Sequence, residues 1–281
     1  MSEDVMRIFC PQWQGSGDSN DLYFSAMEIY EMYLKDRGFI SIDVSSQEKL
    51  GTNKNILGLD SIVENLGRIV DLLTREKPKR IFCVGGDCGV ELGPVSYLNR
   101  IYHSDMSVVW FDAHGDLNTP LSSPSKHFHG MPLRCLLGDG DESILKRCFS
   151  CIRPSQVILA GVRELDPPEM EYISNHNIST VSVDQLIHYK HSIVELIGSK
   201  NLRNIFVHVD LDVLDPDSFP YSKCPSKGGI NKQQLLEHLH KIDDIFNIVG
   251  FSVVEYLSSD NDGKYEVGSL IDFGFGMKSC L

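Results

Sequence analysis

The chain has 281 residues, of which 42% are hydrophobic, and 39 acidic against 26 basic side chains give it a net charge of −13. This length and apolar content suit one large α/β unit or two small ones. So acidic a chain is a poor candidate for binding nucleic acid, which needs clustered Lys and Arg, and is better suited to attracting a small cation. The N-terminal "MSEDVMRIFC" does not read as a signal peptide, and no apolar run approaches the length of a membrane span. We therefore expect a cytoplasmic protein with reduced thiols that binds no membrane.

Alternating strand and helix patterns run along the whole chain. The predicted strands, in chain order, are residues 5–10, 39–44, 80–85, 107–112, 156–161, 179–183, 204–212 and 248–256. Between most of them, apolar residues recur at helical spacing, as in 59–73 and 184–197. Nearly continuous apolar strands indicate a parallel sheet buried on both faces, either open or closed into a barrel. We expect the open form: a three-layer α/β/α sandwich, in one domain over residues 1–281, around a mostly parallel sheet of about eight strands.

Two of these strands end in clusters of acidic residues. In "VVWFDAHGDLNTP", Asp112, His114 and Asp116 follow the strand at two-residue spacing, and they converge if the extended backbone continues through Asp116. In "VHVDLDVLDPD", the same spacing places Asp210 and Asp212 on one face. Because the carboxyl ends of parallel strands lie at one edge, where ligands bind, four carboxylates and at least one imidazole are expected to meet there. A long loop follows each cluster, which is typical of functional segments.

A metal centre is the interpretation that these clusters favour. Four carboxylates without neighbouring Lys or Arg repel one another strongly in a low dielectric, so cations are the natural counter-charge. Carboxylate-rich ligation with one or two nitrogens suits Mn²⁺ or another hard-to-borderline divalent ion, and bridging carboxylates suggest two ions about 3.5–4 Å apart sharing a water. Either cluster alone could be a solvated strand end or an Asx turn. His208 lies one pleat deeper than Asp210, and we interpret it as a buried, hydrogen-bonded structural histidine.

A third strand end carries "IFCVGGDCGVELGP". The segment lacks GxGxxG spacing and no GK[ST] follows, which argues against nucleotide binding. Cys88 is expected in the first turn of the following helix, where the helix dipole stabilises a thiolate, or else is a small apolar core residue. Cys148 and Cys151 form an isolated CxxC, which we interpret as structural or incidental because no second pair accompanies it.

Together, "GGDCGVELG", "DAHGDLNTP", "HVDLDVLDPD" and "FSVVEY" resemble, in order, the motifs of the ureohydrolase (arginase/agmatinase) family, from about Arg80 to Glu255. The resemblance implies an α/β/α sandwich, a binuclear Mn²⁺ centre and hydrolysis of a guanidino or related amidine carbon. The metal ligands that it implies are Cys88, Asp112, His114, Asp116, Asp210 and Asp212. Of these, Asp112 and Asp210 would bridge the two ions, and Asp116 would also bond the bridging hydroxide.

The resemblance also implies roles around the metals. Glu255 would face the guanidinium of the substrate through paired charge-assisted bonds, and His129 in "FHGMP" would shuttle a proton to the leaving amine. The loop "DLNTPLSSPSKHFHGMP" resembles the segment with which arginases recognise an amino acid. The residues implied near the substrate's α-carboxylate, α-ammonium and side chain are Asn118, Ser125, Asp166, Glu169 and Cys224, the last in place of a Thr.

One departure from the family's pattern bears on the substrate. Cys88 stands where the family has His, and a thiolate is charged and softer than an imidazole. The affinity of that site for Mn²⁺ should fall, or its selectivity should shift towards softer ions. The bridging water should then ionise less readily, and hydrolysis of a guanidinium should slow. A substrate with a better leaving group tolerates such a site. The resemblance therefore predicts hydrolysis of Nω-hydroxy-L-arginine to hydroxyurea and L-ornithine, with weaker activity on L-arginine.

Other functions remain open at this stage. The fold also suits an ordinary arginase, or an agmatinase, guanidinobutyrase or formimidoylglutamase. A function of a different class is a metal-impaired pseudoenzyme that acts as a binding protein. The expected partner is a small cationic amino acid, and a homo-oligomer fits the family. The chain stops soon after "SLIDFGFG", without the longer tail that many arginases use between subunits, so the family's trimer is not carried over.

Overall fold

The computed structural model describes residues 5–17, 19–189, 191–258 and 262–278. At its centre, strands pair in the order β2-β1-β5-β10-β9-β6-β7-β8, and each neighbouring pair is parallel. The strands of this sheet are β1 (Val5–Cys10), β2 (Phe39–Ser41), β5 (Arg80–Gly85), β6 (Met106–Phe111), β7 (Val157–Ala160), β8 (Ser179–Val181), β9 (Asn204–Asp210) and β10 (Asn247–Val254). A separate antiparallel hairpin consists of β3 (Thr52–Asn53) and β4 (Ile56–Leu57).

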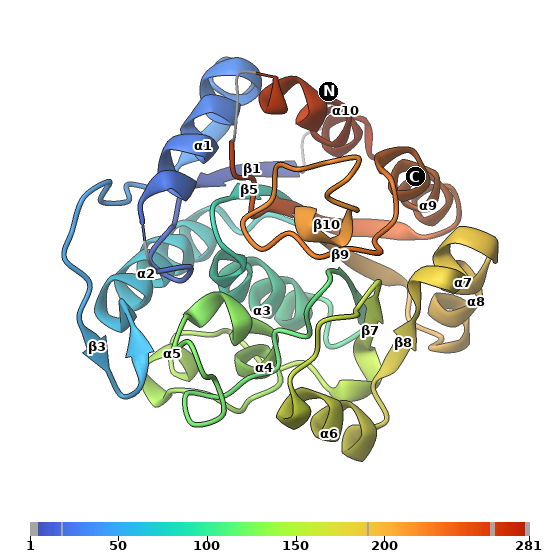
Figure 1. The fold of residues 1–281 in the computed structure, drawn as a ribbon, viewed down its shortest axis with the longest axis horizontal. Helices are drawn as coiled ribbons and strands as arrows, with labels where there is room; N and C mark the ends of the chain where they lie inside the picture. Colours follow the sequence, from blue (N-terminus) through green and yellow to red (C-terminus); the bar gives the residue numbers. More distant parts are fainter. Residues whose placement is uncertain (1–4, 18, 190, 259–261, 279–281) are drawn as a thin grey trace.

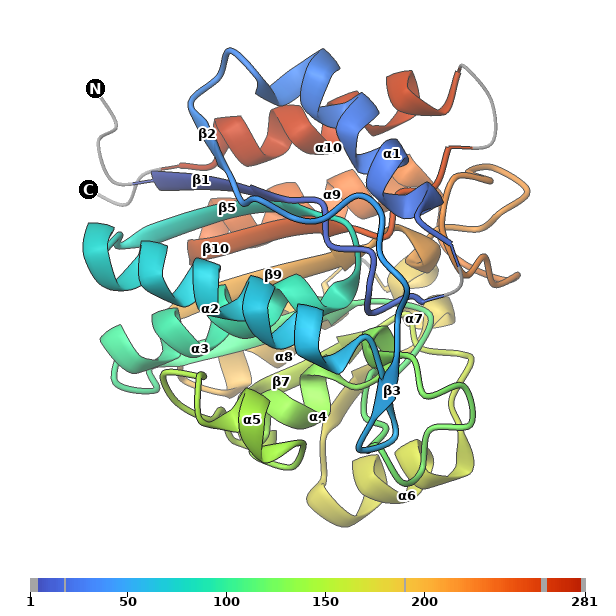
Figure 2. The same cartoon turned by 90° about the vertical axis from the view of Figure 1, so that its left-hand side faces the viewer.

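Helices cover both faces of the sheet (Figures 1 and 2). They are α1 (Asp21–Ile29), α2 (Leu59–Glu76), α3 (Leu92–Ile101), α4 (Pro132–Leu136), α5 (Glu142–Leu145), α6 (Pro167–His176), α7 (Val183–His188), α8 (Ser192–Ser199), α9 (Lys232–Ile245) and α10 (Gly263–Gly276). Figure 2 shows α1 and α10 on one side of the sheet and α2 and α3 on the other. The three-layer α/β/α sandwich with a parallel sheet of eight strands is thereby confirmed.

Alternate residues of the buried strands supply two separate apolar cores. In β5, Cys83 packs into the core that α2 and α3 cover, whereas Phe82 and Val84 pack into the core beneath α9 and α10. On α2, the apolar residues that repeat at helical spacing, among them Ile62 and Ile69, face the first of these cores. Strands buried on both faces explain why their sequences are apolar throughout rather than alternating.

Most strand ends differ slightly from the sequence-based bounds. The predicted strand 39–44 shortens to β2, and 204–212 ends at Asp210 because the chain turns there into a 3₁₀ helix, Leu211–Val213. The predicted helix 184–197 is wrong as one element: it is divided into α7 and α8, since Tyr189 leaves helical geometry with φ −119° and ψ 72°. Among the described residues, no helix has both the length and the apolar character needed to cross a membrane.

The strand order decides where the polar strand ends gather. Strands β5, β10, β9 and β6 are consecutive in the sheet and parallel, so their carboxyl ends form one continuous edge. The sequence motifs singled out above directly follow these four strands. Side chains that are far apart in sequence therefore meet at the centre of one edge, which is where ligands bind in open α/β sheets.

Candidate active site

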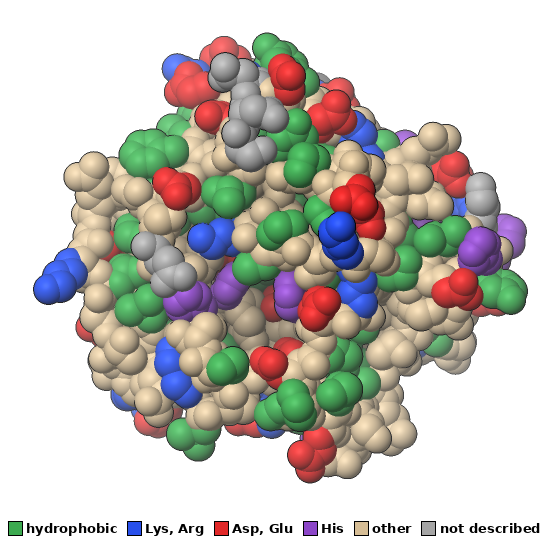
Figure 3. Space-filling view, viewed as in Figure 1, with side chains coloured by type: hydrophobic (Ala, Val, Ile, Leu, Met, Phe, Trp, Pro, Cys, Tyr) green, Lys and Arg blue, Asp and Glu red, His purple; other side chains and the backbone are tan. Residues whose placement is uncertain are grey.

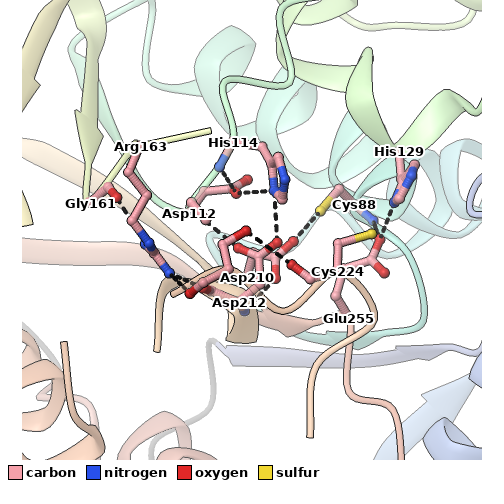
Figure 4. Close-up of polar contacts among 12 residues, drawn as sticks. Cys88, Asp112, His114, His129, Gly161, Arg163, Asp210, Asp212, Cys224 and Glu255 are labelled. Atoms are coloured by element: carbon pink, nitrogen blue, oxygen red, sulfur yellow. Dashed lines mark hydrogen bonds and ion pairs between the residues drawn. The ribbon is translucent and has the colours of Figure 1, made fainter. Parts of the chain in front are cut away.

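A cavity of about 290 Å³ opens at this edge of the sheet. Every site residue that the sequence predicted lines it, except Asp112, which lies fully buried beneath. Figure 3 shows histidine and acidic side chains around the hollow at the middle of this face. The predicted residues are thus brought together in one place, and Figure 4 shows Asp112, Asp210, Asp212 and Cys88 gathered near His114, with His129 and Cys224 beside Glu255.

The end of β6 holds its three polar residues by a turn rather than by an extended strand. The strand ends at Phe111, and Asp116 takes a left-handed backbone conformation with φ +52°. The expectation that the extended backbone continues through Asp116 is therefore wrong, although the convergence is real. The carboxylate of Asp112 accepts hydrogen bonds from the Trp110 indole (3.0 Å) and the His114 backbone N–H (2.6 Å). These bonds fix Asp112 at the bottom of the site.

The end of β9 is tied to the end of β6 through Asp212. One carboxylate oxygen of Asp212 accepts the Ala113 N–H at 2.9 Å, and the other lies 2.8 Å from His114 Nδ1. The Asp212 N–H in turn donates to Asp210 Oδ1 at 2.8 Å. The backbone of one strand end thus positions the carboxylates of the next.

Cys88 lies between the ends of β5, β9 and β10. Its N–H donates to Glu255 Oε1 at 3.0 Å, and its thiol donates to Asp210 Oδ2 at 3.2 Å. The residue begins a short 3₁₀ helix that precedes α3, so it lies earlier than the expected first turn of that helix. Burial, followed by the charges of Asp116 and Asp210, raises the pKa of the Cys88 thiol well above its usual value. In these surroundings a thiolate requires a nearby cation.

Glu255 follows β10 in a left-handed conformation, with φ +61°. For a Glu this backbone costs about 1–3 kcal/mol, and such strain is concentrated at functional positions. Its N–H donates to Gly86 O at 2.7 Å, and Oε1 lies 3.3 Å from His129 Nδ1. The second oxygen, Oε2, is buried and accepts no hydrogen bond from the residues that the structure describes. Glu255 therefore presents a free acceptor to the cavity.

The electrostatics favour bound cations. Burial, with added repulsion from neighbouring carboxylates, raises the pKa of Asp116 and Asp210 well above the ordinary range and also raises that of Asp212. For Asp112, burial acts in the same direction, but the hydrogen bond and charge of His114 lower its pKa below the usual value. The buried Oδ2 of Asp116 accepts no hydrogen bond from the described residues. Divalent cations would satisfy this oxygen and the repelling carboxylates together.

Three groups of side chains are close enough to hold metal ions. Within each group the potential ligand atoms lie within 4.8 Å of one another. The first group is Cys88, Asp112, Asp116 and His208, the second is Cys88, Asp210 and Glu255, and the third is Asp112, His114 and Asp212. Asp112, expected to bridge two ions, belongs to two groups, and so does Cys88, whereas Asp210, the other expected bridging residue, belongs to one. Among the residues that the structure describes, Cys148 and Cys151 belong to none of these groups.

Comparison with known proteins gives the family. Residues 15–264 match the model of the arginase family, and the chain is 31% identical over 264 residues to the arginase of Staphylococcus aureus strain MSSA476, covering 90% of this chain and 87% of that protein. The chain belongs to the arginase family. It is accordingly a hydrolase acting on C–N bonds of linear amidines, in a family that depends on two metal ions.

Solved structures of this family share the fold. The Entamoeba histolytica arginase in complex with L-ornithine has a TM-score of 0.87, with 23% identity and 98% of each chain covered. The Bacillus subtilis formimidoylglutamase has a TM-score of 0.73, with 22% identity, covering 97% of this chain and 86% of that one. These likenesses show that the chain shares its fold with proteins named for different activities.

Opposite the metal-ligating groups, a polar network joins the loop after Asp116 to α6. Asn118 Nδ2 donates to Asp166 Oδ2 at 2.8 Å. Asp166 caps α6, and Glu169 accepts the N–H groups of Asp166 and Leu117, each at 2.9 Å. Both carboxylate oxygens of Glu169 are thus bonded to backbone. The structure therefore gives Glu169 a part in holding the loop against α6 as well as a place in the cavity wall.

The remaining predicted residues lie at the rim of the cavity. Ser125 Oγ accepts the His127 N–H at 3.2 Å and lies 3.5 Å from Ser123 Oγ, so the serine hydroxyls of this loop form a small polar group. Cys224 lies on the opposite loop, and burial with the charge of Glu255 raises its pKa to about 12. Its thiol is therefore neutral near pH 7.

Sequence reasoning missed two residues that hold the site in place. Asp87 is buried and accepts hydrogen bonds at 2.8 Å from Gln12 Nε2 and the N–H groups of Gly15 and Gly89, and burial raises its pKa to about 7. Arg163 donates at 2.7 Å from one guanidinium nitrogen to the carbonyls of Asp212 and Ser226. Asp87 lies inside the quoted motif "GGDCGVELG", whereas Arg163 lies outside the quoted motifs, and nothing in the sequence indicates which backbone groups either residue binds.

Proposed function

We propose that this protein is a binuclear Mn²⁺ amidinohydrolase that converts Nω-hydroxy-L-arginine and water to hydroxyurea and L-ornithine, with weaker activity on L-arginine. The observation that carries the proposal is the position of Cys88. Its sulfur lies 3.2 Å from Asp210 Oδ2 and within the ligand group of Asp112 and Asp116. A thiol therefore lies among the carboxylates to which the proposal assigns the metal ions.

The metal ligands of the proposal are the buried acids of the site together with one imidazole and one thiol: Asp112, Asp116, Asp210, Asp212, His114 and Cys88. Carboxylate and imidazole donors suit Mn²⁺, and the thiol makes one of the two positions softer. When bound, the two ions would lower the pKa of a shared water so that it ionises near neutral pH. The unpaired Oδ2 of Asp116 is available to hold that water in place.

Glu255 and His129 are placed to act on the guanidino group. The free Oε2 of Glu255 can accept from the guanidino nitrogens, while Oε1 holds His129 Nδ1 at 3.3 Å. Burial acts to lower the pKa of His129, but the hydrogen bond and charge of Glu255 outweigh it and raise that pKa above its usual value. The raised pKa favours the protonated form of His129, which could donate to the leaving nitrogen.

The far side of the cavity offers groups for the amino-acid end of the substrate. Asp166 would pair with the α-ammonium, while Asn118 and Ser125 would donate to the α-carboxylate. Glu169 would support them from the cavity wall, and Cys224 lies beside the chain of the substrate. A substrate without an α-carboxylate, such as agmatine, would lose its hydrogen bonds with Asn118 and Ser125 and would therefore bind more weakly.

Chemistry favours the hydroxylated substrate. An anionic sulfur near the ions reduces their Lewis acidity, so less hydroxide forms and a poorly activated guanidinium reacts slowly. The N-hydroxyguanidino group is less basic than guanidine and provides a better leaving group. The weaker nucleophile can therefore still cleave it.

Steady-state kinetics of the Mn²⁺-loaded protein test the proposal. We expect kcat/KM for Nω-hydroxy-L-arginine to exceed that for L-arginine by about tenfold or more, equivalent to about 1.4 kcal/mol in transition-state stabilisation. Two compounds serve as controls: agmatine, which lacks the α-carboxylate, and formimino-L-glutamate, which lacks the guanidino group. A preference for L-arginine would reject the substrate and leave the fold and family unchanged. A protein that binds no Mn²⁺ and turns over none of the four would be a pseudoenzyme.

A further inference from the structure

A histidine lies directly beneath the site. His208 is on β9, two residues before Asp210, and is fully buried. Its ring stacks on Trp110 with 3.6 Å between centroids and 16° between planes. Its Nε2 lies 3.9 Å from Cys88 Sγ. Stacking fixes the plane of the imidazole, so Nε2 is held towards the sulfur.

The other ring nitrogen faces the buried carboxylate of Glu91, which has no hydrogen-bond donor among the described residues. His208 Nδ1 lies 3.3 Å from Glu91 Oε1, and both side chains are fully buried. Neither oxygen of Glu91 accepts a well-aligned hydrogen bond from the described residues, and neither does Nδ1 donate one. The expected burial of His208 is confirmed, and its Nε2 has a long hydrogen-bond contact with Cys88 Sγ, so only Nδ1 is left without a well-aligned partner among the described residues. A carboxylate behind the second ring nitrogen is the arrangement that metal-ligating histidines commonly have, because it fixes the tautomer.

The distances are those of ligands around one ion. A divalent ion at roughly 2.3 Å from sulfur and 2.0–2.1 Å from nitrogen, at a tetrahedral angle, separates the two donors by about 3.6 Å. The 3.9 Å between Cys88 Sγ and His208 Nε2 is close to this value. Ligand atoms of Asp112 and Asp116 complete the group, all within 4.8 Å of one another.

We propose that His208 is a metal ligand: its Nε2 binds, together with Cys88, Asp112 and Asp116, the ion on the Cys88 side of the site. The proposal rests on the proposed function in requiring a binuclear centre, and it names a ligand beyond those of that function. A neutral imidazole adds a donor without adding to the negative charge of a thiolate and two carboxylates. Glu91 Oε1, 3.3 Å from Nδ1, is close enough to accept the Nδ1 proton after a small rotation of either side chain, which would fix the tautomer that leaves Nε2 free for the ion.

Cobalt(II) tests the proposal because it reports on sulfur and nitrogen ligands separately. The full-length protein is loaded with Co²⁺, the bound metal is counted by elemental analysis, and the thiolate-to-cobalt absorption is followed during titration. We expect His208→Gln to bind Co²⁺ at the thiolate position at least about tenfold more weakly, while the ion at His114 remains. His238→Gln is the matched control, since His238 is also buried but bonds Leu186 O at 2.8 Å, away from the site.

X-ray absorption of the cobalt-loaded wild-type protein gives a result that does not depend on how a variant folds. We expect one imidazole for each bound ion, from His114 and His208, whereas His114 alone would give one for every two ions. Two results would each overturn the role of His208 and leave the proposed function intact. One is an average of half an imidazole per bound ion in the wild type, and the other is an unchanged thiolate-to-cobalt absorption in folded His208→Gln. A wild-type protein that binds no Co²⁺ or Mn²⁺ would overturn both.

Discussion

Cys88 is the residue at which this chain differs most in chemistry from what its other motifs lead one to expect. It contacts Glu255 through its backbone and Asp210 through its thiol, so it connects the groups that would bind the substrate with those that would bind metal. Its burial among carboxylates raises the pKa of the thiol, so it ionises only when a cation lies beside it. A Cys at this position would therefore affect metal binding and substrate binding together.

Replacing Cys88 with His should move specificity towards arginine. An imidazole ligand removes one negative charge, so the ions become stronger Lewis acids. We expect the ratio of kcat/KM for L-arginine to that for Nω-hydroxy-L-arginine to rise by about tenfold, or about 1.4 kcal/mol, in Cys88→His. Both substrates are assayed with Mn²⁺ present, and Cys151→Ser, at an exposed thiol outside the cavity, serves as the control. An unchanged ratio would contradict the part assigned to Cys88.

Replacing Glu255 with Gln should remove the charge opposite the guanidino group while keeping an oxygen to accept the Cys88 N–H. We expect kcat/KM to fall by about 10²-fold, in the range of a lost transition-state contact, with the same number of Mn²⁺ ions bound. Kinetics and metal analysis are made on the same preparation. If the activity fell less than about threefold, the guanidino group would have to bind elsewhere.

At the scale of the elements, the sequence predicts which strands end in functional residues but not how the backbone turns after them. Periodicity placed Asp112, Asp210 and Glu255 at the ends of buried strands, and all three are there. The left-handed turn at Asp116 could not be read from it, because that turn depends on contacts with other segments. The backbone contacts of Arg163 depend in the same way on the fold as a whole.

The start of α6 is one element whose stability the site depends on. Glu169 accepts hydrogen bonds from the N–H groups of Asp166 and Leu117 while only 3% exposed, so its removal leaves buried donors without acceptors. We expect Glu169→Ala to lower the free energy of unfolding by about 1–3 kcal/mol and to raise KM more than it lowers kcat. Urea denaturation and steady-state kinetics measure the two effects. Glu171→Ala, at an exposed position of the same helix, should change neither.

The loop after β9 is held by Asp215. Its carboxylate accepts the N–H groups of Asp217 at 2.9 Å, Gly228 at 2.7 Å and Gly229 at 3.1 Å, and these bonds lower its pKa below the usual value. Because the pKa of Asp215 is lower in the folded protein, its ionised carboxylate stabilises the fold at pH values above about 3.9, the pKa of an Asp in the unfolded chain. This stabilisation is lost as the pH falls through the pKa of Asp215 in the folded protein.

Asp215→Asn should therefore be less stable than the wild type at pH 7, by less than about 1 kcal/mol because the carboxylate is partly exposed and screened by solvent. The difference should shrink to zero as the pH falls below the folded pKa of Asp215. Thermal unfolding of both proteins from pH 7 to pH 3 measures it. A difference that stays constant over this range would mean that the charge of Asp215 does not stabilise the loop.

For the whole molecule, strand and helix alternation was sufficient to predict the three layers, because burial on both faces leaves a clear apolar pattern. The strand order was not available from the pattern, and it is this order that makes β5, β10, β9 and β6 neighbours and brings Cys88 within reach of Asp210. The motifs supplied that information indirectly, since they resemble a family whose strands are arranged in this way. The net charge of −13 fits the acidic cavity, since both favour cations.

Metal binding should consequently stabilise the entire fold. The acids of the site repel one another when no metal is bound. Ions that bind only the folded state raise the free energy of unfolding by RT ln(1 + [L]/Kd), where [L] is the free metal concentration, and this is about 2.7 kcal/mol when [L] is 100 Kd. For a chain of this size that corresponds to a rise in Tm of about 5–10 °C. Thermal unfolding is measured without metal, with Mn²⁺, and after a chelator is added to the loaded protein, which should reverse the rise. Asp116→Asn combined with Asp210→Asn removes two charges whose pKa values burial and neighbouring carboxylates raise. This double variant should abolish the response to Mn²⁺ without lowering the Tm of the metal-free protein, because repulsion falls as binding is lost. A rise in Tm that persists in this double variant would place the ions elsewhere in the molecule.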